Sequence, residues 1–211
     1  MSASPDPDSE LFPDDPERAT ARAAWKGAGT MSELGELAAR FLEGDLPFFP
    51  GWMADDIDEE TDDLVPVLAG CCRAGFLTLA SQPAAGESIT HDGRPWRRRA
   101  FVMGFANQVA WERLRELDSG TLSVAAFGAG ESRDVEPVPV GEMGGEPYLF
   151  AGTASGPEEL AIFEDQVAPG GLGALRGTRF VSVIDSNWGE DGRLWDALAR
   201  ALPGRYNPIS R

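Results

Sequence analysis

Polar side chains that could carry chemistry follow two predicted strands. They are Ser81 and Gln82, after the strand at residues 76–80, and Asp185, Asn187 and Trp188, at and after the end of the strand at residues 179–185. In open α/β sheets, ligands bind outside the carboxyl ends of the strands. If these two strands are parallel neighbours, both groups share one edge and could line a ligand site. The other interpretation is a pair of ordinary turns, in which Ser, Asp and Asn bond their own backbone.

His91 is the single histidine of the chain and lies in a polar loop. A Ser–His–Asp triad would therefore have to combine His91 with Ser81 and Asp185, but the G-x-S-x-G turn that supports such a site is missing. We keep Ser81, Gln82, His91 and Asp185 as candidate catalytic residues. Whether the chain is an enzyme stays open.

Metal and cofactor motifs are incomplete in this sequence. One histidine cannot build a histidine-rich zinc site, and the adjacent Cys71 and Cys72 cannot take the usual zinc spacing, so both are predicted to be small core side chains. The G-x-G segments at residues 27–29 and 128–130 complete neither the dinucleotide motif nor a P-loop. We therefore predict no metal site and no cofactor.

The basic cluster of the chain consists of Arg94, Arg97, Arg98 and Arg99, with Trp96 among them. Arginine binds phosphate and carboxylate through paired hydrogen bonds, so the last three arginines are candidate ligands for an anion, together with Asn187 and Trp188. Two alternatives stay open. The arginines could pair with acidic residues of the same chain, or strand alternation could turn Arg98 away from its two neighbours.

A dense acidic run lies at residues 55–63, from Asp55 to Asp63, with seven carboxylates in nine residues. A hard cation could bind such carboxylates, but the run lacks the D-x-[DN]-x-[DN]-G order of an EF-hand loop. Acidic side chains at a helix N-terminus complement the helix dipole, which gives part of the run a structural explanation. The run could also contact this chain's own arginines or a basic protein partner.

Composition limits the class of protein. The chain has 211 residues, 42% hydrophobic and 25% charged, as in a globular domain with a sizeable core. Its 35 acidic and 18 basic residues give a net charge of −17, which argues against binding nucleic acid or an anionic membrane. No apolar run reaches the roughly 18 residues of a membrane span, and no secretory signal is apparent. We expect a cytoplasmic protein, and its oligomeric state is not determined by the sequence.

The charge and the apolar pattern divide the chain into a tail and one domain. Residues 1–16 carry four prolines and five acids and are expected to be a disordered acidic tail, followed by a single domain over residues 17–211. Helices are predicted near residues 16–25, 30–42, 64–75, 107–119, 155–167 and 193–202, and strands near residues 76–80, 99–106, 121–127, 146–152 and 179–185. Residues 82–96 and 168–177 are expected to be loops, and the prolines at 134–140 indicate an edge strand.

This alternation of strands and helices predicts the fold class. We expect an α/β (or α+β) single layered domain, with a mixed sheet of about five strands flanked by helices and an N-terminal helical segment. The capping-box pair Thr30 and Glu33 marks one helix start. The aromatic loop with Phe48, Phe49 and Trp52 suits a ligand pocket, a protein interface or packing on the domain's own core.

Several segments together resemble a known family. They are MSELGELAARFLEG (residues 31–44), ETDDLVPVLAGCCRAGFLTLASQP (60–83), RRRAFVMGF (97–105) and, less closely, SNWGEDGRLWDAL (186–198). In these segments the chain resembles an uncharacterised domain family of streptomycete-type actinobacteria, over about residues 22–202. The use of 17 arginines and one lysine agrees with a high-GC source. The resemblance implies no particular activity, substrate or catalytic residue, and it agrees with a single cytoplasmic domain.

Two function hypotheses follow from the sequence. The first is a non-catalytic, acidic protein-interaction or regulatory module of the immunity-protein kind, which would meet a basic partner through residues 55–63. The second is a small-molecule enzyme or binder for an anionic or nucleotide-like ligand at the strand carboxyl ends. The second requires the arginines, Ser81 and Asp185 to converge on one pocket.

Overall fold

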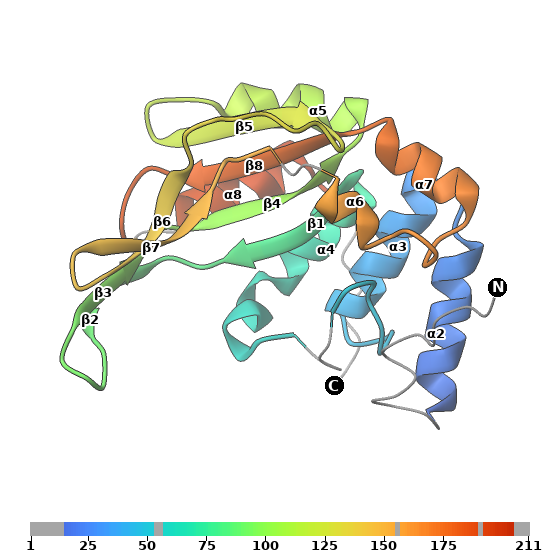
Figure 1. The fold of residues 1–211 in the computed structure, drawn as a ribbon, viewed down its shortest axis with the longest axis horizontal. Coiled ribbons are helices and arrows are strands. Elements are labelled where there is room, and N and C mark those ends of the chain that lie inside the picture. The colour runs from blue at the N-terminus through green and yellow to red at the C-terminus, as the bar shows by residue number, and fades with distance from the viewer. Residues whose placement is uncertain (1–14, 53–56, 155–156, 190–191, 205–211) are drawn as a thin grey trace.

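The computed structural model describes residues 15–52, 57–154, 157–189 and 192–204 (Figure 1). The tail expected at residues 1–16 lies outside the described residues, apart from Asp15 and Pro16. The described helices are α2 (Pro16–Gly27), α3 (Met31–Leu42), η1 (Glu59–Leu64), α4 (Val65–Arg73), α5 (Gln108–Leu114), η2 (Arg115–Leu117), α6 (Glu158–Ala161), α7 (Pro169–Arg176) and α8 (Gly192–Ala201). None of them has both the length and the apolar character that crossing a bilayer requires.

The described strands form two antiparallel sheets. The first has the order β1-β4-β8-β5 and the second the order β2-β3-β6-β7. The strands are β1 (Phe76–Gln82), β2 (Ala85–Ile89), β3 (Pro95–Arg98), β4 (Phe101–Ala106), β5 (Leu122–Gly128), β6 (Val138–Met143), β7 (Glu146–Ala151) and β8 (Arg179–Asp185). The prediction of one mixed sheet of about five strands is therefore wrong, because every pairing between neighbours is antiparallel and the described residues form eight strands in two sheets. The α+β class holds.

The first sheet is buried on both faces. One face packs on α4, α5 and α8 through a cluster that includes Phe76, Val183 and Leu198. On the opposite face, Phe105 and Phe180 meet the helices near the N-terminus, and Ile184 meets the second sheet. Strand alternation explains this division, because successive side chains of β1 and β8 point to opposite faces.

The strongest local signals are confirmed. Thr30 Oγ1 accepts a hydrogen bond from the backbone N–H of Glu33 at 3.2 Å, and Glu33 Oε2 accepts one from the N–H of Gly29 at 2.9 Å. The bond from the Gly29 N–H to the carboxylate lowers the pKa of Glu33, with the Thr30 hydroxyl as a second cause. At the other end of α3, Gly44 takes a φ of +79°, which glycine adopts without strain.

Two expected loops are regular structure instead. Residues 82–96 contain the last residue of β1, all of β2 and the start of β3, and β2 and β3 are joined by a turn in which Gly93 has a φ of +82°. β2 is exposed or half-exposed along its whole length, so it lacks the apolar alternation that marks a strand. The glycine-rich segment 168–177 forms α7, with Pro169 in the first turn. A Cβ on Gly171 would lie only 2.4 Å from the carbonyl oxygen of Ala28. This glycine therefore allows close packing of the helix and does not mark a loop.

Two further expectations need correction. β6 pairs with both β3 and β7, so it is not an edge strand in spite of its prolines. The register shifts between Pro139 and Gly141, and such a bulge tolerates a residue that has no N–H to donate. The helix expected at residues 155–167 is reduced to the four residues of α6 in the described part, and Ser155 lies outside the described residues.

Candidate functional site

The two strand ends selected from the sequence lie at the same edge of the first sheet. β1 and β8 flank β4 and are both antiparallel to it, so they run parallel to each other with one strand between them. Gln82 is in register with Phe101, which is in register with Ile184. Two strand spacings separate Gln82 from Ile184, which is about 10 Å.

At this edge, Gln82, Asp185 and Asn187 make contacts within the protein, whereas Ser81 lines a cavity. Gln82 is buried, and its Nε2 donates to the carbonyl oxygens of Arg99 and Val140, at 2.9 and 3.2 Å. Asp185 is fully buried, and its Oδ1 accepts from the backbone N–H and the Nδ2 of Asn187. The turn interpretation therefore describes Asp185 and Asn187, whose side chains organise their own loop.

Arg97 and Arg99 stack on one tryptophan. Their guanidinium carbons lie 4.5 and 4.3 Å from the centre of the Trp188 ring. Arg97 Nε also donates to Glu142 at 2.7 Å, and Arg99 Nη1 donates to the carbonyl oxygen of Pro139 at 3.1 Å. Burial lowers the pKa of Arg99, and Glu142 opposes that shift. Trp188 follows the first sheet and the arginines belong to the second or follow it, so this stack joins the two sheets.

Arg98 points away from its two neighbours. It makes two hydrogen bonds to Glu60, at 3.1 and 2.6 Å, and lies over the ring of Trp96. Strand alternation thus divides the cluster, and one member of the acidic run at residues 55–63 pairs with it. Of the other acids in that run, Asp55 and Asp56 lie outside the described residues.

His91 is exposed in the turn between β2 and β3. In the described part of the chain, no hydrogen bond joins it to Ser81 or Asp185. Asp185 is enclosed by the protein whereas Ser81 lines a cavity, so the structure does not assemble these three residues into a triad.

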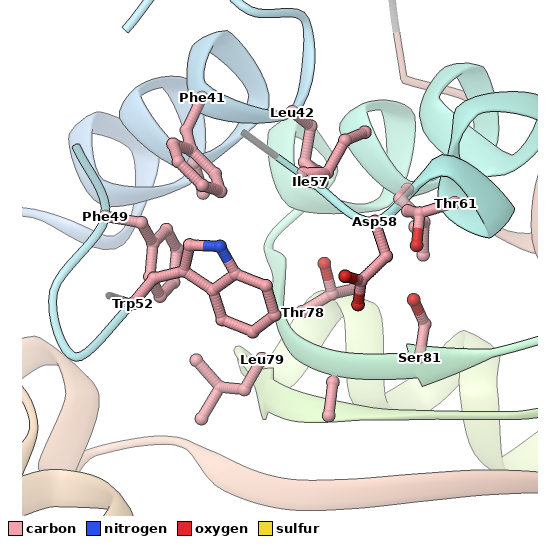
Figure 2. A pocket seen from close by; sticks show the side chains of 13 residues that line it. Phe41, Leu42, Phe49, Trp52, Ile57, Asp58, Thr61, Thr78, Leu79 and Ser81 are labelled. Atoms are coloured by element: carbon pink, nitrogen blue, oxygen red, sulfur yellow. The ribbon is translucent and has the colours of Figure 1, made fainter. Parts of the chain in front are cut away.

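The cavity that Ser81 lines has a volume of about 120 Å³ and lies between α3, η1 and β1 (Figure 2). Its lining comes from α3, from the aromatic loop that follows it, from η1 and the start of α4, and from β1. The residues are Ala38, Phe41, Leu42, Phe49, Trp52, Ile57, Asp58, Thr61, Leu68, Thr78, Leu79, Ala80 and Ser81. Rings gather at one end, and oxygen-bearing side chains at the other (Figure 2).

Asp58 occupies the N-cap position of η1 but does not cap it. An aspartate at this position usually accepts a hydrogen bond from the first backbone N–H groups of the helix. Here Asp58 is exposed, and its carboxylate lies at the edge of the cavity, on the side of Thr78 and Ser81 (Figure 2). Within the described residues, the side chains of Asp58, Thr61 and Ser81 make no hydrogen bond, so these polar groups are available to a ligand.

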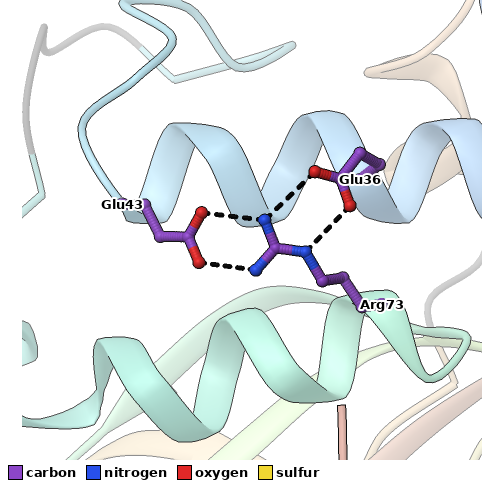
Figure 3. A network of polar contacts seen from close by, with 3 residues as sticks. All are labelled: Glu36, Glu43 and Arg73. Carbon is purple, nitrogen blue, oxygen red and sulfur yellow. Dashed lines mark hydrogen bonds and ion pairs between the residues drawn. The ribbon is translucent and has the colours of Figure 1, made fainter. Parts of the chain in front are cut away.

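Two helices that line the cavity are fastened together by an arginine. Arg73 at the end of α4 donates to Glu36 at 2.8 and 3.1 Å and to Glu43 at 2.5 and 2.8 Å (Figure 3). The side chain of Glu43 is only 2% exposed, so this pair is largely removed from water. Hydrogen bonds from Arg73 lower the pKa of Glu36, and the two carboxylates, Glu43 first, raise the pKa of Arg73.

A family model described as "Domain of unknown function (DUF6919)" matches residues 20–205. The chain belongs to this family. The resemblance expected for residues 22–202 to an uncharacterised domain family is thereby confirmed at the level of the family.

Two curated proteins are similar to parts of this DUF6919 domain. The Schizosaccharomyces pombe protein "Methylenetetrahydrofolate reductase 1" is 28% identical over 121 residues, which is 54% of this chain and 20% of that protein. The Corynebacterium aurimucosum "Tryptophan synthase alpha chain" is 34% identical over 141 residues, which is 66% of this chain and 45% of that protein. The matched part covers less than half the length of either relative, so each name is reported for that protein alone.

Sequence reasoning selected Ser81 but missed its surroundings in the DUF6919 domain. Phe49 and Trp52 were noted as loop aromatics, and both line the cavity, whereas Phe48 is buried and accepts a hydrogen bond from Trp25 Nε1 through its carbonyl. Asp58 was not singled out because it is one of seven acidic residues in the run at residues 55–63. The feature that could have distinguished it is its position directly before a short helix and after the apolar Ile57. The described residues include no group of three His, Cys, Asp or Glu side chains placed to hold a metal.

Proposed function

We propose that this domain is a non-catalytic binding module for a small molecule, and that the cavity between α3, η1 and β1 is its site. The observation that carries this proposal is Asp58, which leaves its helix uncapped and places its exposed carboxylate at the edge of a largely apolar cavity. An apolar cavity with a few convergent polar groups is the usual form of a small-molecule site. The arginine cluster, by contrast, is occupied by contacts within the protein.

The composition of the lining supports binding rather than catalysis. It includes no His, Cys or Lys among the described residues, and Asp58 is its one ionisable side chain. Binding sites need shape and a few hydrogen-bonding groups, whereas acid–base or nucleophilic catalysis needs paired groups with matched roles. The clasp formed by Arg73 supports a preformed site, because it fixes α3 against α4.

A fragment screen by ligand-observed NMR tests the proposal. Ser81→Leu places an apolar side chain where the hydroxyl enters the cavity, and we expect it to abolish binding of fragments that bind the wild-type protein. Ser123→Leu on β5 is the matched control, because Ser123 is an exposed strand residue outside the cavity. The proposal is overturned if, with both variants folded by circular dichroism, no fragment distinguishes Ser81→Leu from the wild-type protein.

A second candidate function is protein interaction, and β7 supplies the observation that favours it. Tyr148 and Phe150 are 46% and 45% exposed, and β7 is an edge strand of the second sheet. Exposed aromatic side chains on an edge strand suit a protein that docks by adding a strand. A basic partner could also use the acidic run at residues 55–63, where Glu59 and Asp63 are exposed.

Affinity capture from a native lysate, washed at graded salt, tests this second function. We expect a stoichiometric partner that Tyr148→Ser with Phe150→Ser releases, if β7 is the docking edge. If this double substitution leaves capture unchanged but the double variant Glu59→Gln with Asp63→Asn loses the partner, the contact belongs to the acidic run. No partner at low salt would contradict the interaction module.

We also propose a cytoplasmic location and a high-GC actinobacterial source. Two free, buried cysteines support the first, since disulfides are rare in the cytosol. The use of arginine in place of lysine supports the second. Fractionation of the native source is the direct measurement of the location.

A further inference from the structure

We propose that the ligand of this cavity is a small organic cation, with an ammonium head at Asp58 and an apolar body against Phe41, Phe49 and Trp52. This inference rests on the function proposed above and adds the chemical class of the ligand. It differs from the anionic ligand expected from the sequence, because the site is now the cavity and not the arginine cluster.

The charge of the lining selects a cation. No Lys, Arg or His is among the described residues that line the cavity, so an anion would find no opposite charge there and would be repelled by Asp58. The nearby Arg98 does not change this balance, because it is paired with Glu60. The exposed Glu59 and Asp63 on the same short helix add negative charge outside the cavity, which raises the local concentration of cations.

The polar end fits the hydrogen bonds of an ammonium group. A primary ammonium has three N–H donors and no acceptor. Asp58 supplies acceptor oxygens, and the hydroxyls of Ser81 and Thr61 face the same space (Figure 2). None of these three side chains is engaged within the described residues. Thr78 is already in contact with Cys72 Sγ at 3.3 Å, so we assign it a smaller part.

The other end fits an apolar body of limited size. The ring of Phe49 is held by Phe41 at 5.5 Å and by Trp25 at 5.2 Å, so the aromatic wall is fixed by the core. Aromatic faces attract cations as well as apolar groups. A cavity of about 150 Å³ in another protein binds benzene, so the present volume of about 120 Å³ suits a molecule of about five or six non-hydrogen atoms.

Titration calorimetry with three probes of similar shape tests the inference. The probes are isobutylammonium, isobutanol and isobutyrate, which are cationic, neutral and anionic. We expect isobutylammonium to bind about tenfold or more tightly than isobutanol, because hydrogen bonds to charged groups are the stronger ones. We expect isobutyrate not to bind.

Variants locate the binding. Asp58→Asn keeps the shape of the side chain and removes its charge, and we expect it to reduce binding of isobutylammonium about tenfold. Asp63→Asn is the matched control on the same helix, outside the cavity, and we expect it to change binding less than twofold. Ser81→Leu should abolish binding.

The outcomes separate this inference from the function it rests on. If isobutanol binds as well as isobutylammonium and Ser81→Leu abolishes both, the cavity is a ligand site but the preference for a cation is wrong. If Mg²⁺ alone competes with isobutylammonium at Asp58, the site takes a metal ion and the inference is overturned. If none of the three probes binds the wild-type protein, the inference is also overturned, while the fragment screen decides separately whether the cavity binds ligands.

Discussion

At the scale of single residues, Trp188 shows why residue types alone did not locate the site. Arginine and tryptophan in polar loops suggest a binding surface, but here two guanidinium groups stack on one half-buried indole. Arg97 and Arg99 donate instead to Glu142 and to the carbonyl oxygen of Pro139. The role of Arg97 and Arg99 is thus decided by their contacts. Their partners lie about 40 and 90 residues further along the chain.

Trp188→Ala is expected to destabilise the protein by about 2 kcal/mol, because it removes two cation–π contacts and apolar packing at the junction of the sheets. Trp96→Ala is the matched control, since Trp96 is also half-buried but is contacted by one arginine, and we expect about 1 kcal/mol. Urea denaturation measures both. Equal losses of unfolding free energy in the two variants would show that the second arginine stacked on Trp188 adds no stability.

Arg73→Met is expected to cost about 3–5 kcal/mol, because it leaves the buried carboxylate of Glu43 without its guanidinium partner. Arg176→Met is the control, since its ion pair with Glu164 is 3.6 Å long and exposed, and we expect a change below about 1 kcal/mol. The free energies of unfolding from urea titrations give the comparison. A small effect of Arg73→Met would mean that the clasp does not hold the helices together.

The pH dependence of unfolding reports on the same clasp. The pKa of Glu36 is lowered in the folded protein by Arg73, so its carboxylate binds protons less readily than in the unfolded chain. The stability that the ionised Glu36 contributes is therefore complete above its ordinary pKa of 4.5, and it is lost as the pH falls through the lower pKa of the folded protein. Glu36→Gln should flatten the fall of the melting temperature below pH 4.5. A parallel curve for this variant would contradict the assignment.

At the scale of elements, the sequence predicted those whose signal is local. α3 has a capping box, an apolar stripe and a C-terminal glycine, and β8 is apolar from Phe180 to Ile184 except at Ser182, so both were found with nearly correct bounds. β2 was missed because its side chains are solvated and its partner β3 decides its conformation. The cavity could be anticipated only in part, as Ser81 and the loop aromatics, because the position of Asp58 depends on how η1 meets β1.

α7 shows how the same residue type can serve two purposes in one helix. Gly171 lies against the backbone of Ala28, so the methyl group of Gly171→Ala would meet a carbonyl oxygen, and we expect a loss of about 1–3 kcal/mol. Gly173 has nothing within 4 Å of a Cβ, so Gly173→Ala should raise stability by up to about 1 kcal/mol through helix propensity. Thermal denaturation distinguishes the two. A loss in both variants would indicate that the helix is held away from its ideal geometry.

At the scale of the whole molecule, the charge and the core are arranged around the first sheet. The net charge of −17 does not leave every carboxylate facing outward, since Glu43 and Asp185 are buried. Helix α4 lies between two apolar clusters, because Cys71 belongs to the one that contains Leu198 and Cys72 to the one that contains Phe105. Cys71 and Cys72 are therefore adjacent in the chain but lie in different apolar clusters.

This arrangement predicts how the two thiols react. Both cysteines are free and almost fully buried, and burial raises the pKa of each thiol, so neither supplies thiolate in the folded state. We expect an aromatic disulfide reagent to modify both thiols in one kinetic phase, at the rate of global unfolding, because the sheet is shared by both clusters and the domain should open as one unit. Cys71→Ala and Cys72→Ala should then each show one thiol that reacts at the same rate under conditions matched for stability. A fast phase confined to one of the two variants would show that one half of the core opens without the other.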